Sequence, residues 1–159
     1  MIELSLVGVR VELPSNQPIV LLKEVDGERF LPIWIGAVEA TAIAFALQGI
    51  QTPRPMTHDL LRDILRENEV HIDSVLISDL VDQTFYATLN MTSSGSQRQI
   101  SSRPSDAIAL AVRTNTPIYA SEEVLEQAGI ELKDEEESEV EKFREFLDQV
   151  TPEDFATEG

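Results

Sequence analysis

Residues 19–36 read IVLLKEVDGERFLPIWIG, and the fold prediction starts from this stretch. Two apolar runs, residues 19–25 and 28–35, flank Asp26-Gly27, a pair that is typical of a two-residue β-hairpin turn. Pro32 has no backbone N–H to donate, so the second strand is expected to lie at a sheet edge or to carry a bulge there. The stretch therefore predicts an antiparallel hairpin.

The segments on either side of this hairpin alternate between strand and helix patterns. Residues 2–13 alternate in polarity, and Gly8 marks a bulge where the alternation changes phase. Hairpins outnumber crossovers, which favours an α+β fold with a mostly antiparallel or mixed sheet packed against Ala-rich helices. Helices are expected at residues 37–48, 57–67, 105–113 and after Ser121, and further strands at residues 72–77, 84–91, 97–101 and 117–120.

The composition divides the chain into a domain and an acidic appendage. The net charge is −17 over 159 residues, and residues 131–159 contribute −9 from 12 acidic and 3 basic side chains. We therefore predict one domain over residues 1–131, followed by an acidic linker and an amphipathic C-terminal helix over residues 132–159. Its apolar stripe is expected to dock on its own domain or on a sister subunit, in preference to a foreign protein. The stripe comprises Val140, Phe143, Phe146, Leu147 and Val150.

Composition also limits the chemistry. The chain has no cysteine, which excludes disulfides, thiolate catalysis and cysteine-based zinc sites. The N-terminus lacks the pattern of a signal peptide, and the longest apolar helical stretch, residues 37–47, is too short for a bilayer and contains Glu39. We expect a cytoplasmic protein without membrane association. Because its acidic field repels nucleic acid, any phosphate chemistry would need clustered arginines, a divalent cation, or both.

Two similar motifs are the candidates for such a site. Residues 54–59 read RPMTHD and residues 103–106 read RPSD, and each precedes an apolar helical pattern. A hydroxyl residue and an Asp at a helix start stabilise its first turn, and an arginine offers a planar fork of donors for phosphate or carboxylate. The motifs therefore predict either two capped helices or one polar site that is built twice.

Individual side chains keep both interpretations open. Asp59 and Asp106, with Glu39, could bind Mg²⁺ or Mn²⁺, although capping is the favoured role of each aspartate taken alone. Arg54 and Arg103 are expected either to bind an anion at the helix starts or to pair with those aspartates.

The remaining side chains that could act on a ligand are a histidine and three aromatic residues. His58 could be a neutral base or a metal ligand, and the simpler alternative is a first-turn histidine that packs or caps. Trp34, Phe85 and Tyr86 lie in apolar strand patterns and are expected to pack in the core.

Taken together, four motifs in register resemble the bifunctional nuclease domain family. They are residues 31–36 with Glu39, residues 54–60, residues 84–87 and residues 103–107, and the acidic tail is similar to that of actinobacterial members. The resemblance covers about residues 1–131 and implies an α+β fold that oligomerises, with a dimer favoured. It also implies, from plant members, nuclease activity on RNA and DNA.

The resemblance leads to a specific functional prediction. We expect metal-assisted hydrolysis of RNA or single-stranded DNA, without an organic cofactor. The alternative is a non-catalytic regulatory or small-anion-binding oligomer, which the acidity and the lack of an established catalytic motif favour. The candidate residues are His58, Asp59 and Asp106 for catalysis, Arg54, Arg103 and Ser105 for substrate binding, and Glu39, Asp59 and Asp106 for the metal.

Overall fold

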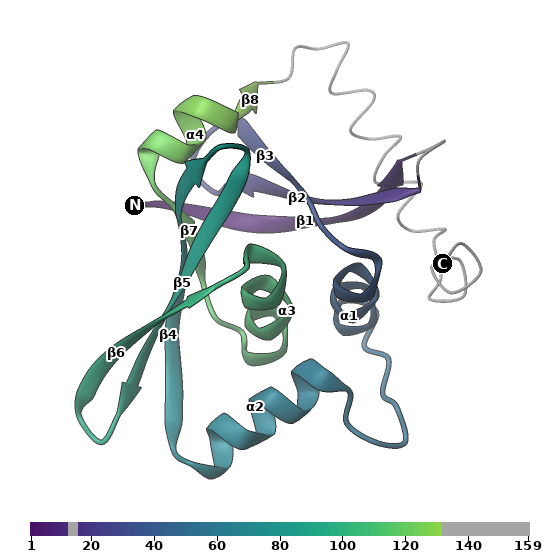
Figure 1. The fold of residues 1–159 in the computed structure, drawn as a ribbon, viewed down its shortest axis with the longest axis vertical. Coiled ribbons are helices and arrows are strands. Elements are labelled where there is room, and N and C mark those ends of the chain that lie inside the picture. The colour runs from purple at the N-terminus through teal and green to yellow at the C-terminus, as the bar shows by residue number, and fades with distance from the viewer. Residues whose placement is uncertain (13–15, 132–159) are drawn as a thin grey trace.

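A computed structural model describes residues 1–12 and 16–131, so the predicted C-terminal helix lies outside the described residues. Within them the chain forms four helices and one mixed eight-stranded sheet (Figure 1), which confirms the α+β prediction. The elements are β1 (Ile2–Glu12), β2 (Gln17–Glu24), β3 (Arg29–Trp34), α1 (Ala37–Leu47), α2 (Thr57–Glu67), β4 (Val70–Val81), β5 (Thr84–Ser93), β6 (Ser96–Ser102), α3 (Pro104–Thr114), β7 (Ile118–Ala120), α4 (Glu122–Ala128) and β8 (Ile130–Glu131).

The predicted hairpin is β2–β3, but its loop is longer than two residues. Lys23 pairs with Phe30, and residues 25–28 form the loop, where the Lys23 ammonium donates to the Gly27 carbonyl at 2.8 Å. On the outer side of β3, the short strand β8 pairs only with Arg29 and Phe30. Pro32 therefore lies where β3 is an edge and no partner strand needs its missing N–H.

The sheet consists of an antiparallel unit of three strands, β6-β5-β4, and an antiparallel unit of four, β1-β2-β3-β8, which are joined by one short strand, β7. Its order is β6-β5-β4-β7-β1-β2-β3-β8, and β7 is antiparallel to β1 and parallel to β4. The expected bulge in β1 is present, since its register with β2 shifts between Leu6 and Gly8. The sheet is thus mixed, because α3 carries the chain from β6 back to the centre (Figure 1).

Helices α1 and α3 are the Ala-rich pair of the prediction, and they pack against each other beside the sheet (Figure 1). Small side chains let the helix backbones approach closely, and the largest fully buried side chains lie in α1, α3, α4 and strands β2, β3 and β4. No helix within residues 1–12 and 16–131 is long and apolar enough to cross a membrane. The buried alanines of the pair are Ala40, Ala42, Ala44, Ala107, Ala109 and Ala111.

Helix α2 contrasts with this pair because it is attached at one side of the core. It contacts α3 and β4, and its only fully buried residue is His58. Leu65 packs against the core, whereas Leu60, Leu61 and Ile64 remain exposed. The placement of α2 therefore presents His58 to α3 and leaves an apolar face outside.

Candidate functional site

The two Arg-Pro motifs meet at a histidine–aspartate pair. His58 is the second residue of α2, Asp106 is the third of α3, and His58 Nε2 lies 3.0 Å from Asp106 Oδ1. The His58 side chain is only 8% exposed, while Asp106 is one-third exposed. Helix packing thus brings together two residues that are 48 positions apart, one from each motif, at one polar site.

Arg103 extends this pair to a third helix. Its Nε donates to Asp106 Oδ2 at 2.9 Å, and its Nη2 donates to Glu39 Oε1 of α1 at 2.8 Å. The Arg103 side chain is 64% exposed. A guanidinium carries five N–H donors, so donors beyond these two remain available toward solvent. His58, Asp106, Arg103 and Glu39 form a continuous chain, which we call the relay cluster.

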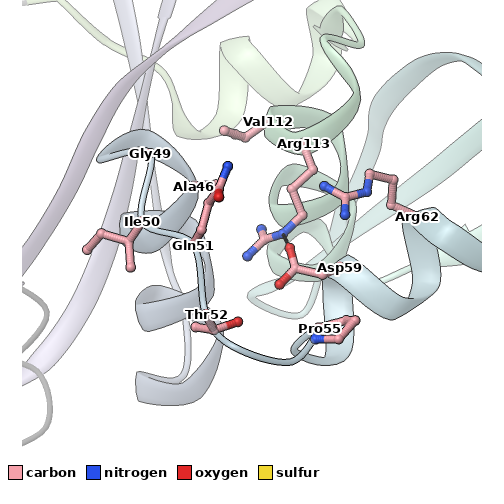
Figure 2. A pocket seen from close by; sticks show the side chains of 10 residues that line it. All are labelled: Ala46, Gly49, Ile50, Gln51, Thr52, Pro55, Asp59, Arg62, Val112 and Arg113. Atoms are coloured by element: carbon pink, nitrogen blue, oxygen red, sulfur yellow. Dashed lines mark hydrogen bonds and ion pairs between the residues drawn. The ribbon is translucent and has the colours of Figure 1, made fainter.

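Asp59 does not join the relay cluster, although it follows His58 in the sequence. Its Oδ1 accepts from Arg113 Nε at 2.7 Å, and its Oδ2 accepts from the Met56 backbone N–H at 3.0 Å. Figure 2 shows Asp59 and Arg113 pointing toward one another at one wall of a cavity of about 440 Å³, with Arg62 beside them. Asp59 therefore has the capping role that the sequence favoured, together with a buried ion pair.

Arg113 is a functional neighbour that the sequence motifs did not reveal. Its side chain is 5% exposed, and its two terminal nitrogens donate to Ala109 O at 2.8 Å and Ala42 O at 2.9 Å. One side chain thereby connects α1, α2 and α3. The signal that could have revealed it is a charged residue in the last turn of an otherwise apolar, Ala-rich helix, because such a residue needs a buried partner.

Both aspartates are held in the charged form. Burial raises the pKa of Asp106, but hydrogen bonds from Arg103 and His58 outweigh it, and the net pKa lies below the ordinary value. Burial likewise raises the pKa of Asp59. Hydrogen bonds from Arg113 and the Met56 N–H lower it by more, so the net pKa of Asp59 also lies below the ordinary value. At neutral pH each carboxylate is therefore an acceptor only, and Asp106 takes the N–H of His58 Nε2.

The lowered pKa of Asp59 predicts acid sensitivity of the fold. A carboxyl group with a lower pKa in the folded state contributes stability above its unfolded pKa of about 3.9 and loses it as the pH falls through the folded value. We expect the free energy of unfolding to drop on acidification below about pH 4. Asp59→Asn should show a smaller drop over that range, as measured by urea denaturation at successive pH values. Parallel curves for the two proteins would contradict this assignment.

The predicted metal ligands do not converge. Asp59 faces Arg113, whereas Glu39 and Asp106 face Arg103. No group of three or more His, Cys, Asp or Glu side chains that could hold a metal ion occurs in the described part of the chain. The carboxylates do not fit a shared cation site in this arrangement, and each accepts a hydrogen bond from an arginine instead.

The two other predicted substrate-binding residues differ in exposure. Arg54 is exposed and makes no ion pair with another described residue, so the expected alternative of an Arg54–Asp59 pair is not formed. Ser105 is buried and lines a second cavity of about 410 Å³ together with Arg103. The N-terminus of α3 thus belongs both to the relay cluster and to this cavity.

The aromatic residues correct a prediction, since two of the three are not core residues. Trp34 is 52% exposed and Tyr86 is 45% exposed, whereas Phe85 is partly buried against the core. Trp34 is the last residue of β3 and follows the buried Ile33, so the strand alternation turns its ring outward. Trp34 and Phe85 line the second cavity, on the same surface as Arg103.

Comparison with known proteins agrees with the family resemblance of the motifs. The family model described as the bifunctional nuclease domain matches residues 20–133. An uncharacterised protein of Mycobacterium tuberculosis is 49% identical over 96% of this chain and 97% of its own length. Bifunctional nuclease 1 of Oryza sativa is 26% identical over 74% of this chain, and bifunctional nuclease 2 of Arabidopsis thaliana is 27% identical over 77%.

These matches define the class of protein. The chain belongs to the bifunctional nuclease domain family, as its motifs indicated. The matches to the rice and Arabidopsis proteins span only 36% and 39% of those proteins, so the shared region is one part of a larger plant chain.

Proposed function

We propose that this chain is a nuclease that hydrolyses phosphodiester bonds of RNA or single-stranded DNA at the relay cluster. The observation that carries the proposal is the 3.0 Å contact between His58 and Asp106, which unites both motifs next to an exposed arginine. Membership of the nuclease domain family supports the reaction class.

The proposed chemistry divides among three side chains. Asp106 accepts a hydrogen bond from the N–H of His58 Nε2, which fixes the ring tautomer and leaves Nδ1 as the basic nitrogen. Nδ1 would take a proton from the water that attacks phosphorus, the P–O bond to the leaving sugar oxygen would break, and that oxygen would take a proton from solvent. Arg103, on the other oxygen of the same carboxylate, would stabilise the phosphate charge. Glu39 holds the Arg103 guanidinium in place through Nη2.

The decisive experiment is hydrolysis of defined substrates by the purified full chain. Single-stranded RNA, single-stranded DNA and duplex DNA would each be incubated with Mg²⁺, with Mn²⁺ and with a chelator. We expect cleavage of the single strands. Asp106→Asn would be purified in parallel, and equal cleavage by both preparations would identify a contaminant and reject the proposal. Cleavage that persists in the chelator would show that these residues act without a cation.

A regulatory, anion-binding role is the second candidate function. It is favoured by the two carboxylates that already occupy Arg103, since they lower the affinity of this site for a polyanion more than for a small anion. Its signature would be a rise in melting temperature with inorganic phosphate, without hydrolysis of any nucleic acid. A rise with oligonucleotides accompanied by cleavage would reject it in favour of the nuclease.

We further propose that a second copy of the chain covers the exposed apolar face of α2. Leu60 and Ile64 lie one turn apart on this face, and an apolar cluster of this kind is more typical of interfaces than single exposed leucines are. Light scattering should show a dimer for the wild type and a monomer for the double variant Leu60→Glu/Ile64→Glu. Val81→Glu, at an equally exposed apolar residue, should remain dimeric. A monomeric wild type would contradict this proposal.

A further inference from the structure

The second cavity has features that the proposed reaction at the relay cluster does not use. It lies where the end of β3, the start of β5 and the N-terminus of α3 meet, and its volume is about 410 Å³. Ligand pockets of small molecules begin at about 300 Å³. Its apolar walls are Trp34 and Phe85, and its polar groups include Arg103, Gln17 and Thr84.

Trp34 gives the cavity an aromatic surface that is open to solvent. The residue is half exposed, whereas the neighbouring Ile33 and Ile35 are buried, so the backbone that carries the indole is anchored at the end of the strand. An exposed indole offers a flat π-face that stacks on any nucleobase, and such stacking tolerates different base sequences. The hydroxyl of Thr84 and the amide of Gln17 add donors and acceptors suited to a base edge.

Arg103 connects this aromatic surface with the relay cluster. It lines the cavity and also donates to Asp106, whose other oxygen contacts His58. Its positive charge would attract the phosphate of a nucleotide whose base lies against Trp34, because guanidinium groups pair with phosphate oxygens. The net negative charge of the chain repels polyanions in general, so base stacking must contribute to the affinity if a nucleic acid is to bind in this cavity.

We propose that this cavity binds one unpaired nucleobase by stacking on Trp34, with the adjoining phosphate on Arg103. The proposal rests on the proposed nuclease function in one respect, because the phosphate on Arg103 is taken to be the one that His58 helps to hydrolyse. Bases in a duplex are already stacked and paired, so the cavity selects single strands. Trp34 is a binding residue here, and its role is independent of the proton transfer assigned to His58.

The test uses Trp34 as its own reporter, since the chain has a single tryptophan. Tryptophan fluorescence of the full-length His58→Gln variant, in which hydrolysis is expected to be at least about 100-fold slower, is titrated with adenosine monophosphate, inorganic phosphate, single-stranded oligodeoxyadenylate and a matched duplex. We expect saturable quenching by the nucleotide and the single strand, little by the duplex, and none by phosphate. Absence of quenching by the single strand, or equal quenching by the duplex, would overturn the proposal.

Matched variants separate stacking from charge. With a fluorescein-labelled single strand, Trp34→Ala should weaken binding about 5- to 100-fold by anisotropy, and Trp34→Phe should bind close to the wild type. Arg103→Gln should bind at least about tenfold more weakly, while Arg98→Gln, on the exposed strand β6, should not. Equal binding by Trp34→Ala and the wild type would overturn the proposal. Binding without hydrolysis in the wild type would support the base-stacking site and reject the nuclease function. Hydrolysis without quenching of Trp34 fluorescence would support the nuclease function and reject the base-stacking site.

Discussion

Replacing His58 with glutamine is expected to lower the rate of phosphodiester hydrolysis by about 100- to 10,000-fold, the usual contribution of a positioned acid–base group. Glutamine keeps an N–H that can donate to Asp106, so the packing of α2 on α3 is retained while the basic nitrogen is lost. The measurement is kcat on a labelled single-stranded substrate. His71→Gln is the matched control, because His71 is exposed at the start of β4 and should leave kcat unchanged.

Combining substitutions of His58 and Asp106 tests whether the two residues act as a unit. If Asp106 acts only by orienting His58, then Asp106→Asn in the His58→Gln background should cost little beyond the single variant, because groups that act as a unit are non-additive. Melting temperatures of all variants would verify that they are folded. Rate losses that multiply in the double variant would contradict a joint role, and an unchanged rate in His58→Gln would remove His58 from the mechanism.

Arg113→Met is expected to be the most destabilising of the substitutions considered, by about 3 kcal/mol, because it leaves a partly buried carboxylate without its partner. The methionine preserves most of the apolar stem but removes the hydrogen bonds to Asp59 Oδ1, Ala109 O and Ala42 O. Urea denaturation should show a lower midpoint with an unchanged slope.

Two companion variants show whether the lost charge pair is the cause. Arg113→Met/Asp59→Asn should recover part of the lost stability, since it no longer contains an uncompensated carboxylate. Arg98→Met, at an exposed position on β6, should stay within about 0.5 kcal/mol of the wild type. Should Arg113→Met fail to fold, Arg113→Lys tests the same ion pair and is expected to lose less stability. If the urea midpoint of Arg113→Met equals that of the wild type, Arg113 does not stabilise the packing of α1, α2 and α3.

The fold was predictable from sequence where local patterns determine it. The hairpin β2–β3, the bulge at Gly8 and the ends of α2 follow from alternation, glycine and turn residues, which act over a few positions. The length of the loop at residues 25–28 did not follow, because the contact from Lys23 to the Gly27 carbonyl replaces the expected two-residue turn. Strand β8 was missed because two residues carry too little pattern to predict a strand.

The site was predictable in its components but not in its connections. The two Arg-Pro motifs contain His58, Arg103 and Asp106, which were candidates because polar residues at helix starts are visible in sequence, and helix packing brings these three side chains together. Which arginine pairs with Asp59 depends on how three helices pack, and that partner, Arg113, lies 54 residues away. The outward direction of Trp34 likewise depends on where β3 ends, which alternation alone could not locate.

The position of β7 has a kinetic consequence. Strands β4, β5 and β6 on one side and β1, β2 and β3 on the other are joined by hairpins between neighbouring segments, so their contacts are local in sequence and can form early. β7 has three residues, and it pairs with β1, which lies more than a hundred positions earlier in the chain. Joining the two units therefore carries the largest loop-closure cost in the described fold. It requires α3 to have crossed to the centre, and the relay cluster, which depends on α3 reaching α1 and α2, is expected to assemble only in that last step.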